Sequence, residues 1–113
     1  LGFMYHKVGV RQDKKEALKR YLKAADQGHA EAQCTLGFMY FSGEGVSRDN
    51  YEAVQWYRKA AEQGHARSQH LLGLMYFSGK GVRQNKKEAL KWHRKAAGQG
   101  YKSAKDLLWQ LGY

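Results

Sequence analysis

Histidine, cysteine and serine are the side chains in this sequence that could do chemistry, and their spacing matches no common active site. None of the 5 histidines lies four residues from another, the spacing at which two imidazoles on one helix face bind zinc. No serine is followed three residues later by lysine, the arrangement that activates a serine nucleophile in β-lactamases. No Ser–His–Asp set is recognisable either. We therefore predict a protein that is not an enzyme, with no catalytic residue, no metal site and no cofactor.

The individual histidines have simpler interpretations. His29 and His65 occupy equivalent positions after a glycine, where Tyr101 stands later in the chain, so we interpret them as turn residues. His70 and His93 are expected to stand apart from each other in the fold.

The single cysteine, Cys34, has no partner for a disulfide bond within the chain, which fits a reducing compartment. Its position is taken elsewhere by His70 and Asp106, so we expect Cys34 to be a tolerated surface residue. A reactive role would require a lowered thiol pKa, of which the sequence gives no sign.

The net charge of +10 raises an alternative function, the electrostatic binding of nucleic acid or another anionic surface. Residues 1–29 carry +4, residues 30–65 carry −2, residues 66–101 carry +7 and residues 102–113 carry +1. The lysines of the two basic units form rows: Lys14, Lys15, Lys19 and Lys86, Lys87, Lys91. Uncharged residues occupy the equivalent positions between them: Asn50, Tyr51 and Gln55. A surface that tracks a nucleic-acid backbone should be continuously basic, so this interruption favours a solvated face.

The sequence contains no segment that could span a membrane. Its longest apolar runs, such as Leu71–Phe77, are far shorter than the roughly 20 residues that cross a bilayer. No secretory leader opens the chain, which begins without an initiator methionine and in the middle of a repeat. We interpret it as a trimmed or processed fragment. We expect it to be soluble, in the cytoplasm or, if a signal peptide has been removed, in the periplasm or outside the cell.

An internal repeat determines the predicted fold. Residues 30–65 and 66–101 align without a gap over 36 positions, 20 of which are identical. Residues 1–29 are the same unit entered at its Leu-Gly step and one residue shorter in its loop. Residues 102–113 repeat only the first part of the unit. We divide the chain into a partial first repeat, two full repeats and a C-terminal capping helix.

Each full repeat is predicted to form two helices. The first helix spans about residues 30–41, with Ala32, Leu36 and Tyr40 on one apolar face. Gly37 lies in the middle of this helix, where it costs about 1 kcal/mol in helix propensity. We therefore expect another helix to pack closely against Gly37. A Ser-Gly-Glu-Gly loop then ends the first helix.

The second helix is predicted to begin at a polar cap. Asp49 and Glu52 have the spacing of a capping box, in which each side chain binds the free backbone N–H of the other. The same spacing recurs in the other units, as Asp13 with Glu16 and Asn85 with Glu88. The expected buried face consists of Ala53, Val54, Tyr57, Ala60 and Ala61. Glycines in the left-handed conformation are expected to end these helices: Gly28, Gly64 and Gly100.

Stacking is required because one helical hairpin cannot cover its own apolar faces. Residues 102–113 would lay one more helix over the last open face, with Trp109 in place of the packing glycine. The N-terminal end has no such cap. We expect that end to permit self-association or contact with missing upstream sequence.

The motifs of residues 30–65 are similar to those of a known family. The order Leu-Gly-x-x-Tyr, Gly-x-Gly-Val and Ala-x-x-Trp-Tyr-x-x-Ala-Ala-x-x-Gly resembles the Sel-one-like repeat (SLR), a relative of the tetratricopeptide repeat. Arg20 at the Trp position, His93 at the Tyr position and the shortened loop before Gly9 depart from the pattern. The resemblance implies an all-α, right-handed α/α superhelical solenoid of antiparallel helix pairs. It also implies that the protein is a scaffold or adaptor for protein contacts, and such proteins are often bacterial. Cysteine-rich members of the family have a disulfide in each repeat, but this chain lacks the cysteines for them.

The resemblance further implies that the first helices line a concave side that binds a partner protein or peptide. The positions of this face form the predicted partner-binding groove: Phe3, His6, Cys34, Phe38, Phe41, His70, Leu74, Phe77 and Tyr113. Aromatic and apolar residues of this kind suit an extended or helical peptide. The alternative left open by the sequence is that Phe41 and Phe77 only pack between successive hairpins.

Overall fold

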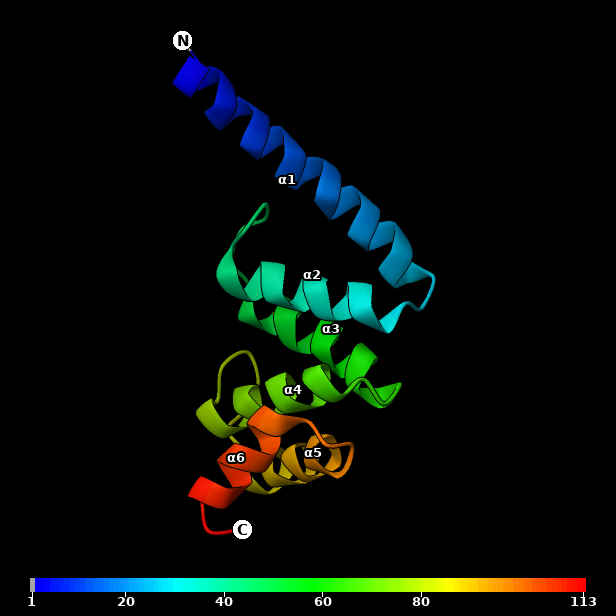
Figure 1. The fold of residues 1–113 in the computed structure, drawn as a ribbon, viewed down its shortest axis with the longest axis vertical. Helices are drawn as coiled ribbons and strands as arrows, with labels where there is room; N and C mark the ends of the chain where they lie inside the picture. Colours follow the sequence, from blue (N-terminus) through cyan, green and yellow to red (C-terminus); the bar gives the residue numbers. More distant parts are fainter. Residues whose placement is uncertain (1) are drawn as a thin grey trace.

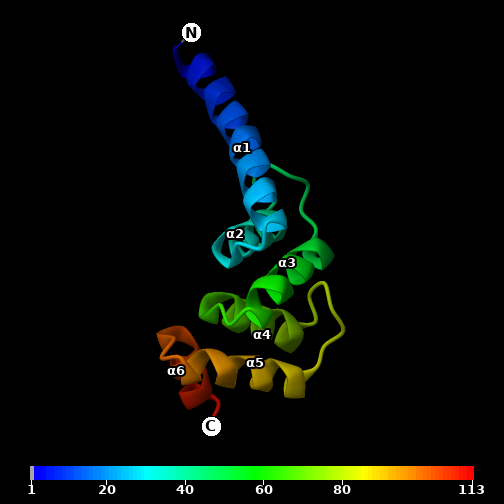
Figure 2. The ribbon, with the colours of Figure 1, turned by 90° about the vertical axis from the view of Figure 1, so that its right-hand side faces the viewer.

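Helices follow one another along the described part of the chain. The computed structural model describes the backbone of residues 2–113 and the side chains of residues 13–113. Over this range the structure is all-helical, in the order α1 (Gly2–Asp26), α2 (Ala30–Ser42), α3 (Asn50–Glu62), α4 (Ala66–Ser78), α5 (Lys86–Gly98) and α6 (Lys102–Gln110). Each helix packs against the next, and the helix pairs form a right-handed α/α superhelical solenoid (Figure 1). The molecule is elongated, at 54 × 28 × 26 Å, and α1 projects beyond the stack in both views (Figure 2).

Helix α1 differs from the sequence prediction. The predicted loop and the cap at Asp13 are wrong, because residues 2–26 form one continuous helix. In the second repeat, Gly43 ends α2 with a φ of 78°, a conformation that glycine adopts without strain. The first unit has no glycine at this point of its shortened loop, so the signal that ends the helix is missing.

The two full repeats follow the predicted hairpin. Asp49 Oδ1 accepts a hydrogen bond from the backbone N–H of Glu52 at 3.1 Å, and Asn85 Oδ1 accepts one from Glu88 at the same distance. The reciprocal half of the predicted capping box is replaced by a backbone bond. Asp49 N donates to the carbonyl oxygen of Tyr40 at 2.8 Å, which ties the start of α3 to the end of α2.

The helices that close each unit end as predicted. Gly28, Gly64 and Gly100 have φ values of 92°, 92° and 86°. After Gly64, the N–H of His65 donates to the carbonyl oxygen of Ala60 at 3.2 Å, the bond of a Schellman motif. This turn fixes the angle at which the next unit begins.

The core has two clusters because α2 is covered on two sides. Ala32, Leu36 and Met39 pack towards α1, while Cys34 packs with residues of α3 and α4. The five apolar residues predicted for the buried face of α3 are all buried: Ala53, Val54, Tyr57, Ala60 and Ala61. Burying apolar surface on both sides of a helix is the stabilising principle of a repeat stack.

The mid-helix glycines that recur between the repeats mark close helix contacts, as predicted. A Cβ atom placed on Gly37 would lie 2.5 Å from Cε1 of Tyr57, and one placed on Gly73 would lie 2.7 Å from Cε1 of His93. Each glycine therefore makes room for a ring from the second helix of its own repeat.

A chain of glutamine side chains links successive repeats. Gln63 Nε2 donates to Oε1 of Gln33 at 2.8 Å, and Gln33 Nε2 donates to the carbonyl oxygen of Ala25 at 3.1 Å. One repeat later, Gln99 Nε2 donates to Oε1 of Gln69 at 2.9 Å in the same way. These bonds satisfy the buried amides of Gln33 and Gln69, which would otherwise destabilise the core.

Candidate partner-binding surface

Exposed apolar side chains lie on α2 and α4 at equivalent positions of the repeat. Phe38 on α2 and Leu74 on α4 are 43% and 39% exposed, and Phe77 is 40% exposed. Phe41 is partly buried and packs against the core. Tyr113 is exposed beyond the end of α6. Exposed apolar side chains that gather on a protein surface often mark binding sites.

Two of the predicted groove residues, Phe3 and His6, lie outside the side chains that the structure describes. Two others lie inside the protein. Cys34 is 2% exposed and His70 is 8% exposed. The prediction of Cys34 as a surface residue is wrong, and burial raises the pKa of its thiol, which opposes a reactive role.

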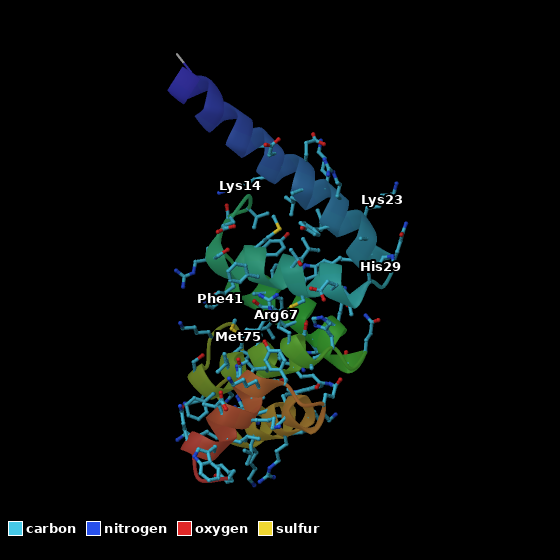
Figure 3. All side chains as sticks on the ribbon, in the orientation of Figure 1. Lys14, Lys23, His29, Phe41, Arg67 and Met75 are labelled. Carbon is cyan, nitrogen blue, oxygen red and sulfur yellow. The ribbon has the colours of Figure 1, made fainter. Side chains whose placement is uncertain are left out.

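A first hollow lies between α2, α3 and α4. It measures about 110 Å³ and is lined by Phe38, Phe41, Tyr57, Leu71, Leu74 and Met75. Figure 3 labels Phe41 and Met75, which come from α2 and α4, the first helices of successive repeats. Three of the predicted groove residues thus surround one small apolar depression.

A second hollow lies one repeat further on, against α5 and the C-terminal segment. It measures about 230 Å³ and is lined by Phe77, Lys86, Ala89, Leu90, His93, Leu111 and Tyr113. Phe77, His93 and Leu111 stand 36 residues after Phe41, Tyr57 and Met75 of the first hollow. The two hollows are therefore the same feature of successive repeats.

His70 and His93 form a buried pair, so the prediction that they stand apart is wrong. Their Nδ1 atoms are 3.2 Å apart, and the His70 ring lies 5.5 Å from the ring of Tyr101. Burial lowers the pKa of both imidazoles, and burial together with the neighbouring His70 lowers the pKa of His93 to about 4. The sequence alone gives no signal for the pair, but the structure has the equivalent contact in the preceding repeat. Cys34 and Tyr57, which meet in the preceding unit, occupy the same two positions.

A hydrogen-bonded set of serine, histidine and glutamate joins two repeats. His65 Nδ1 lies 2.7 Å from Ser68 Oγ, and His65 Nε2 lies 2.7 Å from Glu31 Oε2. Ser68 is completely buried, and its N–H donates to the same Nδ1 atom at 3.3 Å. A buried serine cannot meet a substrate, so His65 acts as the cap of α4, in agreement with its interpretation as a turn residue.

Several cations lie over aromatic rings, which places part of the positive charge against the apolar surface. Lys59 Nζ is 4.5 Å from the centre of the Trp56 ring, and Lys95 Nζ is 4.6 Å from that of Trp92. Lys86 lies 6.0 Å from the Phe77 ring centre. Such contacts stabilise exposed sites by about 0.5–1 kcal/mol each.

Within the described residues, no group of three or more histidine, cysteine, aspartate or glutamate side chains is arranged to hold a metal ion. None of the described helices combines the length and the apolar character needed to cross a bilayer.

Comparisons with known proteins agree on one kind of repeat. A family model described as the Sel1 repeat matches residues 1–29, 30–65 and 66–101. A Sel1 repeat protein from Oxalobacter formigenes superposes with a TM-score of 0.78 at 49% identity, covering 80% of this chain and 37% of that protein. A comparison with curated protein sequences gives no match.

Two further solved structures are similar. The protective antigen c5321 of uropathogenic Escherichia coli, which displays an SLR fold, gives a TM-score of 0.73 at 46% identity over 74% of this chain and 18% of that one. Cysteine-rich protein B of Helicobacter pylori gives a TM-score of 0.77 at 31% identity. The match covers 80% of this chain and 68% of that protein. The chain thus spans well under half the length of the first two of these proteins.

Proposed function

Because the chain belongs to the Sel1 repeat family, we propose that it binds another protein or a peptide through the exposed side chains of α2 and α4. Sel1 repeat proteins are generally helical scaffolds for protein interactions and are typically not catalytic. The partner binds along the stack and contacts Phe38, Leu74 and Phe77. The chain itself performs no reaction.

The observation that carries the proposal is the pair of apolar hollows one repeat apart. Each lies beside exposed groove residues, Phe38 and Leu74 at the first and Phe77 and Tyr113 at the second. Binding energy in interfaces concentrates in apolar and aromatic anchors that fill such depressions. Two hollows at the repeat spacing would receive two side chains of one extended or helical segment.

The electrostatic alternative gains no support from the fold. Helix α3 lies between the lysine rows of α1 and α5 and presents Asn50, Tyr51 and Gln55 at the equivalent positions. A nucleic-acid backbone that followed the lysine rows along the stack would cross these three uncharged positions.

A binding experiment tests the scaffold function. The immobilised chain is exposed to a nuclease-treated extract of the source organism, the retained protein is identified, and its affinity for the chain is measured by calorimetry with purified components. We expect the double substitution Phe38→Ser/Phe77→Ser to weaken this affinity at least tenfold, because each anchor of an interface contributes on the order of 1–2 kcal/mol. Both residues are more than one-third exposed, so the fold should persist, which circular dichroism checks.

The matched control is Tyr51→Ser. Tyr51 is an exposed aromatic residue on α3 that lines neither hollow. Its substitution should leave the affinity unchanged. If the double variant binds the partner as tightly as the wild type does, the binding site lies elsewhere on the molecule.

A further inference from the structure

We propose that the second hollow recognises an acidic peptide segment, in which an apolar side chain enters the hollow and a neighbouring carboxylate pairs with Lys86. This inference rests on the proposed scaffold function and specifies the chemistry of the partner. It concerns the hollow lined by Phe77, Lys86, Ala89, Leu90, His93, Leu111 and Tyr113.

The size of the hollow suits one side chain. At about 230 Å³ it is roughly twice as large as the hollow of the preceding repeat, which measures about 110 Å³. His93 lines the second hollow at the position that Tyr57 occupies in the first hollow. Because the imidazole ring is smaller than the phenol ring of tyrosine, it leaves more space. The volume is still below the roughly 300 Å³ at which pockets for whole small molecules begin. A leucine or phenylalanine side chain of a peptide is the matching occupant.

The charge at the hollow distinguishes it from its counterpart. Lys86 lines the second hollow. The equivalent residue of the preceding repeat is the uncharged Asn50, which does not line the first hollow. Arg94 lies 5.6 Å from the ring centre of Tyr113, so a second cation adjoins the rim. No aspartate or glutamate side chain is among the lining residues.

The surrounding repeat strengthens this positive field. Residues 66–101 carry 8 basic residues and 1 acidic residue, Glu88. In the part of the chain whose side chains are described, neither Lys86 nor Arg94 takes part in an ion pair. Complementary charge next to an apolar anchor supplies both specificity and a faster association rate. An acidic segment is therefore favoured over a neutral one.

The test uses synthetic tripeptides as probes, acetylated and amidated at their ends. The first carries phenylalanine between two aspartates, the second phenylalanine between two asparagines, and the third alanine between two aspartates. Each is titrated into the ¹⁵N-labelled protein while backbone amide shifts are followed. We expect the first peptide to shift signals of Phe77, Lys86 and Tyr113. The other two should bind at least threefold more weakly, because each lacks one of the two contacts.

Variants with matched controls locate the contacts. Lys86→Gln should weaken binding of the first peptide about three- to fivefold, the effect of one exposed ion pair. Lys87→Gln changes the net charge equally at an exposed residue that does not line the hollow, and should have no comparable effect. The pair His70→Cys/His93→Tyr restores the side chains of the preceding repeat, narrows the hollow, and should weaken binding of the phenylalanine peptide.

Three results would overturn the proposal. They are equal affinity for the aspartate and asparagine peptides, shifts that map away from the hollow, and stronger shifts of the same signals by a short oligothymidylate. The first two leave the scaffold function intact if Phe38→Ser/Phe77→Ser still loses the natural partner, so the two proposals can fail separately. The third would assign the site to nucleic acid.

Discussion

The Nδ1 atoms of His70 and His93 lie 3.2 Å apart in the core between α4 and α5. Only one of the two nitrogens can carry the proton of this contact, so the pair is stable when both imidazoles are neutral. Desolvation opposes a positive charge on either ring, and a charge on one ring opposes a charge on the other. The pair therefore links the stability of the third repeat to pH.

We predict that the free energy of unfolding falls as the pH decreases below about 6.5. The folded-state pKa of His93 is about 4, whereas the ordinary value is 6.5, so the unfolded chain binds more protons between these two values. The stabilising effect of the neutral pair is complete above pH 6.5 and is lost on the way to pH 4. The expected loss from His93 is about 2–3 kcal/mol at pH 4.5. Urea unfolding at pH 7.5 and 4.5 measures it.

The control for this prediction is His70→Cys/His93→Tyr, which installs the pair found at Cys34 and Tyr57 in the preceding repeat. This variant should lose less stability over the same pH interval, because acidic groups still titrate but the imidazoles are gone. Equal losses in both proteins would show that the histidine pair does not control the pH dependence.

A second prediction concerns the mid-helix glycines. Gly73→Val should destabilise the protein by about 1–3 kcal/mol, because its side chain would overlap the buried ring of His93. The control is Gly98→Ala at the end of α5, where an added Cβ atom would meet nothing within 4 Å. That variant should be as stable as the wild type or slightly more stable. An unchanged denaturation midpoint for Gly73→Val would refute the close contact.

The sequence predicted the repeats' local structure well because local signals decide it. Asp49 caps α3, and Gly43 ends α2, through residues within a few positions of each bond. Helix α1 is the exception. Asp13 has the spacing of a helix cap, but the first unit has no glycine at the position of Gly43, where α2 ends, and the helix continues to Asp26.

The candidate site was less predictable because it depends on packing between units. Ala32, Leu36 and Tyr40 mark a single apolar face, but a helix in a stack is covered on two sides, and Cys34 faces the second. The contact of His70 with His93 spans 23 residues and follows from helix pairing, which no local pattern reveals. Phe38 and Phe77 were identified because they lie on the first helices of their repeats, on the face opposite the predicted core face, and both are exposed.

A third prediction uses the helix caps. Asp49→Ala should cost about 1 kcal/mol in the free energy of unfolding, because the N–H of Glu52 loses its acceptor. Asp13→Ala removes the same residue type at the equivalent position of the first unit, but Asp13 lies inside α1 and is exposed. Its substitution should cost less than about 0.5 kcal/mol. A loss at Asp13 as large as that at Asp49 would indicate that α1 is broken there in solution.

The last prediction concerns α6, which we infer to cap the stack. Ala104 and Leu108 are buried on its inner face, and α6 packs against α5. Removing residues 102–113 should uncover apolar side chains of α5 and cause self-association, because an uncovered end of a repeat stack is apolar. Sedimentation velocity measures the oligomeric state of the truncated protein.

Trp109→Ser in the full chain separates this effect from the loss of an exposed aromatic residue. Trp109 is 84% exposed on the outer face of α6, so its replacement should leave stability and oligomeric state nearly unchanged. If the truncated chain remains a stable monomer, α6 does not act as a cap. In the Trp109→Ser variant, α6 still covers the apolar surface of α5. If this variant alone self-associates, the outer face of α6, and not its cover of α5, prevents association in the wild type.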